Sequence, residues 1–166
     1  MRFDLKKYMD TGREPYLRQF TADFCARTFP GYSVEKPFEA AFSAKRERDN
    51  LVLHLQAEAP VSGECARCLD PVAYTAAVNV EWLVTEADLN PEAEFDLPLD
   101  EKGHLDVDEW LFQEILLDVP SVLLCSPDCL GLCPDCGKKM AECSCQVAET
   151  PAPADPRLSI LKSLLN

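Results

Sequence analysis

The stretch that decides the fold covers residues 51–84 and reads LVLHLQAEAPVSGECARCLDPVAYTAAVNVEWLV. Apolar residues alternate with polar ones over residues 51–59 and again over 72–84, which is typical of strands with one buried face. Between these segments stand Cys65 and Cys68, in a turn that ends before Pro71. We therefore expect two neighbouring antiparallel strands with a Cys-x-x-Cys motif at the tip of their connection.

Two further segments upstream extend this sheet. Residues 34–45 alternate clearly, and the polar run that follows ends in the turn-favouring pair Asp49 and Asn50, so a hairpin leads into residue 51. Residues 20–26 also alternate, although a helical stripe fits the same positions; we interpret them as a strand. The consecutive strands form an antiparallel meander, open or partly closed.

One amphipathic helix is expected after the strands. Asp106, with Glu109 three residues later, resembles a capping box, and Pro120 ends the segment. We expect this helix to lie across the apolar face of the sheet, to bury Trp110 in the core and to deliver the chain to Cys125. Its apolar stripe consists of Leu111, Phe112, Ile115, Leu116 and Val119.

The expected fold class is α+β, with an antiparallel sheet, a helix packed on it and a C-terminal cysteine-rich zinc module. The domain boundaries follow from composition. Residues 1–124 form the sheet and helix, and within them residues 86–104 are acidic and are predicted to be a mobile loop. Residues 125–145 form the zinc module. Residues 146–166 form a Pro/Ala-rich linker and a short helix that begins at Asp155.

Charge and cysteine content limit the possible functions. A net charge of -13 disfavours broad binding to phosphate backbones and suits a basic protein partner. No apolar segment reaches the length of a membrane span, so we expect a cytoplasmic protein without a membrane contact. Nine cysteines, odd in number and clustered in short spacings, favour metal ligation over disulfides in a reducing compartment.

Eight of the cysteines can be shared between two zinc ions. The rival partition joins the two Cys-x-x-Cys pairs around one ion and leaves the other cysteines unligated or in a poorer site. We favour two sets of four, although Cys143 and Cys145 reach one ion only if a turn separates them. Cys25 is left over. The favoured sets are Cys65, Cys68, Cys125 and Cys129, and Cys133, Cys136, Cys143 and Cys145.

Complete thiolate sets favour structural over catalytic zinc, because four protein ligands leave no position for water. A hydrolase that uses zinc-bound water is therefore disfavoured, and no small-molecule substrate is expected. The alternative is a thiol redox protein that uses its Cys-x-x-Cys pairs. The residues around Cys65 lack the strand-then-helix context of such motifs, so we favour a non-enzymatic protein.

Several short motifs recur in the order of a known family. The segment Cys65-Ala-Arg-Cys68-Leu-Asp-Pro71 is similar to the Cys-x-Arg-Cys-Leu-x-Pro signature of the YceD-like family, the large ribosomal RNA subunit accumulation proteins. The segments 114–120, 125–137, 143–145 and 155–158 resemble longer members of that family in order and spacing. One departure is Lys139-Met140-Ala141, where such members often have Asn-Leu-Asn. The resemblance covers Val52 to Leu165.

The resemblance implies a non-enzymatic role in ribosome biogenesis, in the accumulation of large-subunit rRNA. The partner would be this rRNA or a basic ribosomal protein, and the net charge of -13 favours a protein partner with local RNA contact. Arg67 is the strongest contact candidate, because a turn pinned by two thiolates would present its guanidinium outward. Arg67 can instead neutralise its own thiolate cluster. The cations near the cysteine turns are Arg67, Lys138, Lys139, Arg157 and Lys162.

Overall fold

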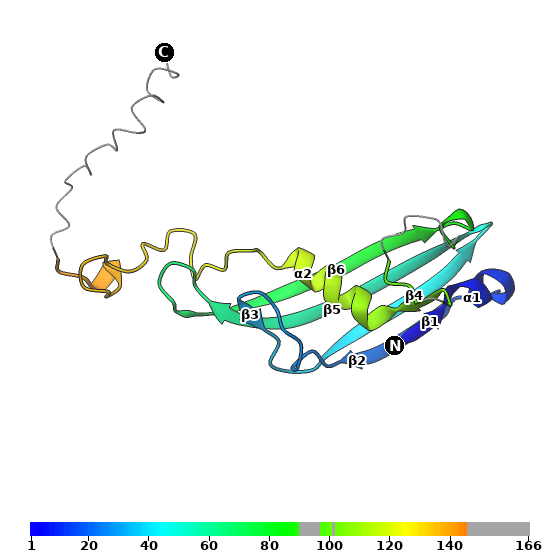
Figure 1. Ribbon diagram of the computed structural model, residues 1–166, viewed down its shortest axis with the longest axis horizontal. Coiled ribbons are helices and arrows are strands. Elements are labelled where there is room, and N and C mark those ends of the chain that lie inside the picture. Colours follow the sequence, from blue (N-terminus) through cyan, green and yellow to red (C-terminus); the bar gives the residue numbers. More distant parts are fainter. Residues whose placement is uncertain (90–96, 101, 146–166) are drawn as a thin grey trace, which may run out of the picture. The chain divides into compact units, whose positions relative to one another are not determined.

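The computed structural model describes residues 1–89, 97–100 and 102–145 and has an α+β architecture (Figure 1). The chain divides into two compact units, Met1–Cys129 and Leu130–Asn166. The sequence placed its boundary after residue 124, whereas Cys125 and Cys129 fold with the sheet. The linker and short helix expected over residues 146–166 fall outside the described residues.

The main sheet of the first unit is antiparallel throughout. Strand β5 lies at its centre and pairs along its full length with β6 on one side. On the other side β5 pairs with β4 and with the short β3, and β2 pairs with the far side of β4. The strands are β2 (Tyr16–Ala22), β3 (Tyr32–Ser33), β4 (Phe38–Glu47), β5 (Asn50–Glu64) and β6 (Pro71–Val84).

The antiparallel meander is confirmed, but its bounds shift. Strands β5 and β6 run up to the Cys-x-x-Cys turn from both sides. The turn between β4 and β5 holds Arg48 and Asp49, so Asn50 already belongs to β5 instead of the turn. The segment predicted as a strand over residues 20–26 is β2, which starts earlier and ends at Ala22.

Alternation of the side chains places one face of the sheet in the core. Phe42, Leu53 and Leu55 are fully buried, while the residues next to each of them along its strand are exposed or half-buried. Helix α2 (Val107–Asp118) crosses this face (Figure 1), and its Trp110 is 1% exposed, as predicted. The ring of Phe42 meets the Trp110 ring edge-on, with 6.4 Å between their centroids.

The start of α2 differs from the predicted capping box. The side chain of Asp106 accepts hydrogen bonds from the backbone N–H groups of Asp108 and Glu109, as expected of an N-cap. The Glu109 carboxylate does not return to the cap, because it pairs with Arg27 at 2.6 Å. The backbone N–H of Asp106 donates instead to the Pro98 carbonyl at 3.0 Å. The long-range ion pair therefore replaces the second half of the box.

Several short elements were not predicted. The N-terminal residues form β1 (Arg2–Asp4) and helix α1 (Leu5–Thr11), and β1 pairs with β7 (His104–Asp106) in a small antiparallel sheet. The segment predicted as a loop over residues 86–104 contains a 3-10 helix at Ala87–Leu89, and its last residue, His104, begins β7. Leu97 within this segment is buried, at 4% exposure. Residues 90–96 and 101 of that loop fall outside the described residues.

The turn before β7 gives a prediction about pH. Asp100 makes hydrogen bonds with the backbone N–H and with the side chain of His104. These bonds, the backbone bond most strongly, lower the pKa of the Asp100 carboxyl from 3.8 to about 2. The ionised carboxylate thus stabilises the fold above about pH 4, and that contribution disappears as the pH falls through about 2.

We expect Asp100→Asn to lack this dependence. Denaturant midpoints measured from pH 5 to pH 2 should fall more steeply for the wild-type chain than for Asp100→Asn, because acid effects elsewhere are common to both proteins. If the midpoints of the two proteins fell in parallel with pH, the ionised Asp100 carboxylate would not contribute to stability as described.

Candidate metal centres

The cysteine sulfurs gather in two sets of four, one in each unit. Within each set the four Sγ atoms all lie within 4.8 Å of one another. These sets follow the favoured partition of the eight cysteines, and Cys25 belongs to neither. The first set is Cys65, Cys68, Cys125 and Cys129, and the second is Cys133, Cys136, Cys143 and Cys145.

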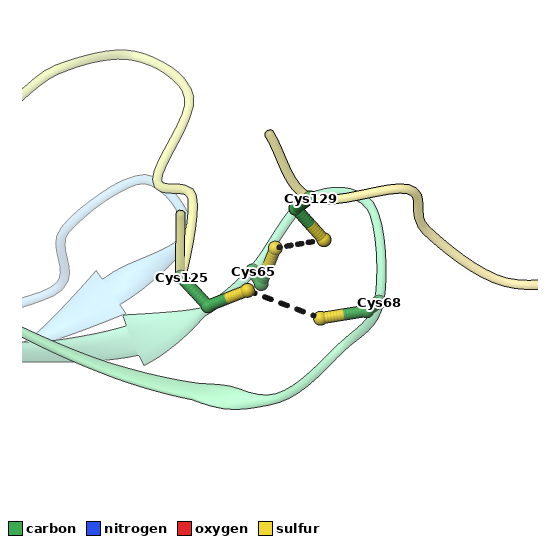
Figure 2. Close-up of side chains that lie close together, drawn as sticks. All are labelled: Cys65, Cys68, Cys125 and Cys129. Atoms are coloured by element: carbon green, nitrogen blue, oxygen red, sulfur yellow. Dashed lines mark hydrogen bonds between the residues drawn. The ribbon is translucent and has the colours of Figure 1, made fainter. Parts of the chain in front are cut away.

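Sulfur spacings in the first set fit a tetrahedral ion and do not fit disulfides. The Sγ atoms of Cys65 and Cys129 lie 3.8 Å apart, and those of Cys68 and Cys125 lie 3.5 Å apart (Figure 2). Four sulfurs at about 2.3 Å from a zinc ion lie about 3.8 Å from one another, whereas a disulfide needs about 2.05 Å. The set can therefore hold a metal ion without large movement of its side chains.

The 65–70 turn holds the first two sulfurs at the tip of the β5–β6 hairpin. The Cys65 N–H donates to the Asp70 carbonyl at 2.8 Å, and the Leu69 N–H donates back to the Cys65 carbonyl at 2.9 Å. These bonds close the loop between the two cysteines, so both thiols face the same side. Leu69 completes the turn with a φ of 62°, in the left-handed region that favours glycine.

Cys125 and Cys129 reach this turn through two anchors. The Leu123 carbonyl accepts a hydrogen bond from the Ala66 N–H at 2.9 Å, and the Leu123 side chain lies over Gly63, where an added Cβ would approach Leu123 Cδ1 to 2.6 Å. The absence of a side chain at Gly63 thus allows the chain after α2 to lie against the end of β5. Arg67 supplies the second anchor, since its Nη1 donates to the carbonyls of Pro127 and Cys129 at 3.3 and 2.8 Å.

The second set of sulfurs is built on a copy of the same turn. The Cys133 N–H donates to the Lys138 carbonyl at 2.7 Å, and the Gly137 N–H donates to the Cys133 carbonyl at 2.9 Å. This is the hydrogen-bond pattern of the 65–70 turn, and Gly137, with a φ of 69°, stands where Leu69 stands in the first copy. Both Cys-x-x-Cys pairs therefore lie on turns with the same backbone hydrogen bonds.

A local hydrogen bond resolves the difficulty of the Cys-x-Cys pair. The 3-10 helix η2 (Met140–Glu142) leads into Cys143, and the Cys145 N–H folds back to donate to the Cys143 Sγ atom at 3.2 Å. The Sγ atoms of Cys136 and Cys143 lie 3.4 Å apart. Both cysteines of the pair can therefore reach the same ion.

The family model described as large ribosomal RNA subunit accumulation protein YceD matches residues 53–165, which is more than half of the chain. This chain belongs to the YceD family. The family implies a role in the accumulation of the large ribosomal subunit RNA. Neither the curated proteins nor the solved structures searched gave a match.

Electrostatics of the two YceD clusters favour a bound cation. Hydrogen bonds from backbone N–H groups, the strongest from Cys125, lower the pKa of the Cys65 thiol to about 6. The backbone N–H groups of Cys136 and Asp135 lower the pKa of the Cys133 thiol to about 7. The neighbouring sulfurs of Cys143 and then Cys136 raise the pKa of Cys145 to about 12. An ionised thiol thus opposes the ionisation of a neighbouring one, and a divalent cation, if bound, would supply the missing counter-charge.

The expected contact residues have different surroundings. Arg67 is exposed, and its Nη1 hydrogen bonds hold the 127–129 segment, so its guanidinium has a structural role that the sequence did not predict. Lys138 is exposed beside the second cluster, and Lys139 is half-buried there. Arg157 and Lys162 fall outside the described residues. RNA contact by these cations stays a prediction.

Thiol redox chemistry finds little support in the geometry. The close pairs in the first cluster join Cys65 to Cys129 and Cys68 to Cys125, and so cross between the two segments. A redox Cys-x-x-Cys pair instead forms its disulfide within the motif, usually at the start of a helix. The 65–70 turn connects two strands and starts no helix.

Leu69 gives a prediction about the first turn. Its left-handed backbone is unfavourable for leucine, and its side chain is 60% exposed. Leu69→Gly should therefore raise the free energy of unfolding by about 0.5–1 kcal/mol, the conformational strain less the entropy cost of glycine. Chemical denaturation of the metal-loaded protein measures this change.

The matched control is Gly137→Ala in the second copy of the turn. An added Cβ there meets nothing within 4 Å, so the substitution adds only backbone strain and should destabilise its unit by about 1 kcal/mol. A loss of stability in Leu69→Gly would contradict the equivalence of the two turns and would show that the leucine side chain packs on its surroundings.

Proposed function

We propose that this YceD-family chain is a non-enzymatic, cytoplasmic factor in ribosome biogenesis that holds two structural zinc ions. The observation that supports the proposal is the convergence of eight thiols into two complete sets of four, within a family tied to the accumulation of large-subunit rRNA. Thiolates at this spacing suit zinc better than magnesium or calcium, which prefer oxygen ligands. Zinc is therefore the metal that these residues would hold.

The two ions would have different structural tasks. In the first unit, the ion would fasten the segment that follows α2 to the tip of the β5–β6 hairpin, where Leu123 and Arg67 already hold it. In the second unit, Cys133 is the one buried apolar side chain among the described residues 130–145, so metal ligation would replace a hydrophobic core. The second unit would then be unfolded without its ion.

Structural zinc also supports the proposal that the chain is not an enzyme. Four thiolate ligands saturate a tetrahedral ion, so no coordination position is left for a reactive water or for a small-molecule substrate. The side chains His54 and His104 bond to Asn79 and Asp100 and belong to neither cluster. The proposed function is therefore binding, with the clusters as rigid supports for exposed residues.

The partner is large-subunit rRNA, a basic ribosomal protein or both. A net charge of -13 opposes wide contact with RNA, so RNA contact would be local and would use cations fixed near the clusters. Lys138, on the second turn, has the exposure that such a contact needs, and Arg67, Lys139 and Arg157 are the other candidates. The acidic remainder of the surface suits a basic protein.

A salt series tests the RNA contact. Filter binding of the zinc-loaded chain to large-subunit rRNA should show affinity that falls as salt rises, with a log–log slope of about one to three for a few phosphate contacts. Lys138→Glu should weaken binding several-fold at low salt, and the exposed Lys36→Glu in the first unit should leave it unchanged. No binding at low ionic strength would remove the RNA contact and leave the protein partner.

A further inference from the structure

Strand β6 is a long edge strand of the main sheet. It covers Pro71–Val84, pairs with β5 along its whole length, and no other strand of the described residues pairs with its far side. An exposed edge presents a row of N–H and C=O groups that a further strand can bind. Natural edges are usually protected by lysine, proline or a bulge, whereas residues 72–83 contain one charged residue, Glu81.

Two hydrogen bonds, one at the tip of the hairpin and one in the middle of β6, show which backbone groups point outward. The Cys65 N–H donates to the Asp70 carbonyl, so odd residues of β5 and even residues of β6 form the bonded pairs of this ladder. The backbone of the odd β6 residues therefore faces away from β5. Ala77 confirms this parity, because its N–H donates to the Asp118 side chain and not to β5.

Asp118, at the end of α2, occupies one position where a neighbouring strand would supply its carbonyl. Its Oδ2 atom lies 3.1 Å from the Ala77 nitrogen and 3.3 Å from the Tyr74 hydroxyl. The carboxylate therefore acts as a single acceptor placed on an otherwise open edge. A strand added beside β6 would extend this pattern to Thr75, Asn79 and Glu81, whose backbone faces the same way.

A hollow lies where such a strand would run. It has a volume of about 300 Å³ and lies between the edge of β6 and the last turns of α2. Leu117 borders it with 79% of its side chain exposed, more than any other large apolar residue of the described chain. The hollow is lined by Ala77, Val78, Asn79, Val80, Glu114, Leu117 and Asp118.

Charge selects the kind of segment that fits. Helix α2 and strand β6 together contain no lysine or arginine, and their ionisable residues are all acidic, with Glu114 and Asp118 in the hollow and Glu81 on the edge strand. A basic segment with apolar side chains would thus find opposite charges and an apolar contact in Leu117. A second copy of β6 would bring another Glu81 to this acidic edge and would supply no cation, so self-pairing is disfavoured.

We propose that the groove between β6 and α2 binds an extended basic peptide, which adds to β6 as a further strand of the main sheet. Main-chain hydrogen bonds would give affinity, and the acidic residues and Leu117 would give selectivity. The proposal deepens the proposed function, on which it rests for its biological partner, by naming an extended segment of a basic protein as the ligand.

A defined peptide tests the groove directly. The probe is an acetylated, amidated nine-residue peptide in which lysine alternates with valine, with a fluorescent label, titrated into the full zinc-loaded chain and followed by anisotropy. We expect saturable binding, together with slower hydrogen exchange at Thr75, Asn79 and Glu81. The same peptide methylated on every backbone nitrogen should bind at least ten-fold more weakly, because it can donate no hydrogen bonds to the edge.

Exposed residues provide the variants. Leu117→Lys should weaken binding of the lysine–valine peptide at least ten-fold, and Glu81→Lys, an independent change on the edge strand, should weaken it at least three-fold. The matched control is Leu17→Lys, because Leu17 is 71% exposed on the opposite edge strand β2 and should leave the affinity within two-fold. Circular dichroism melting curves check that each variant is folded.

Four results would overturn the inference. They are no saturable binding, equal binding of the methylated peptide, equal losses in Leu17→Lys and Leu117→Lys, or pairing of two chains through β6 that excludes the peptide, seen by sedimentation. Zinc content and rRNA binding of the same samples separate this failure from that of the proposed function. If the peptide fails while two zinc ions and rRNA binding persist, the groove proposal alone falls.

Discussion

Cys136→Ser should remove one zinc ion per chain and unfold residues 130–145, while the sheet unit stays folded. The described residues of the second unit bury one apolar side chain, Cys133, so no hydrophobic core can replace the lost ligand. Metal binding in small zinc modules contributes about 10–16 kcal/mol of folding free energy. Loss of one ligand from four should therefore exceed the stability of the unit.

Native mass spectrometry and limited proteolysis measure this effect together. We expect one zinc ion instead of two in Cys136→Ser, and rapid cleavage within residues 130–145. Cys25→Ser is the matched control, because Cys25 is an exposed cysteine outside both clusters and its replacement should leave two ions and the protease pattern unchanged. Loss of metal in Cys25→Ser, or full metal content in Cys136→Ser, would contradict the partition of the ligands.

Trp110→Ala should give the largest loss of stability in the sheet unit, about 3–5 kcal/mol. The indole is 1% exposed between α2 and the sheet, contacts the Phe42 ring and donates from Nε1 to the Glu114 carboxylate at 2.8 Å. Its removal would leave a large cavity and an acceptor without its donor. Urea unfolding followed by far-ultraviolet circular dichroism measures the change.

The control for this change lies on the same helix. Leu117→Ala removes an apolar side chain that is 79% exposed, so its effect on stability should stay within about 0.5 kcal/mol. If Trp110→Ala cost no more than Leu117→Ala, α2 would not be packed on the sheet as described. A loss of stability in Trp110→Ala that was confined to the second unit would also contradict this packing.

Long, half-buried elements were predictable from the sequence because their environment imposes a simple period. Alternation over residues 51–59 and 72–84 identified β5 and β6, since one face of each strand faces the core and the other faces solvent. Spacing alone indicated α2 and its buried Trp110. Strands β1 and β7 have three residues each, too few to show a period, and were therefore missed.

Long-range partners account for the remaining differences. The spacing of Glu109 predicts a capping box, but Arg27, distant in sequence, takes its carboxylate. The turn of Cys65 and Cys68 predicts an outward Arg67, yet the 127–129 segment places two carbonyls within reach of its Nη1. The equivalence of Leu69 and Gly137 was hidden because a leucine gives no sign of a left-handed backbone. Such pairings depend on tertiary structure, which local patterns do not encode.

Cysteine spacing predicted how the sulfurs group, but it did not predict the backbone conformation that brings them together. The sequence leaves open whether the Cys-x-Cys pair can reach one ion; in the structure the Cys145 N–H folds back onto the Cys143 Sγ atom, and both sulfurs lie in one set. The first set depended on a contact between β5 and the segment after α2. The absence of a side chain at Gly63 permits this contact, and no local pattern marks that glycine as special.

Zinc content of the purified chain tests the central claim most directly. Protein purified in reductant, without added metal, should contain two zinc ions per chain by inductively coupled plasma mass spectrometry, with all nine cysteines reduced. A chain without metal whose cysteines titrate as disulfides would contradict the claim that the two sets of four thiols are structural zinc sites.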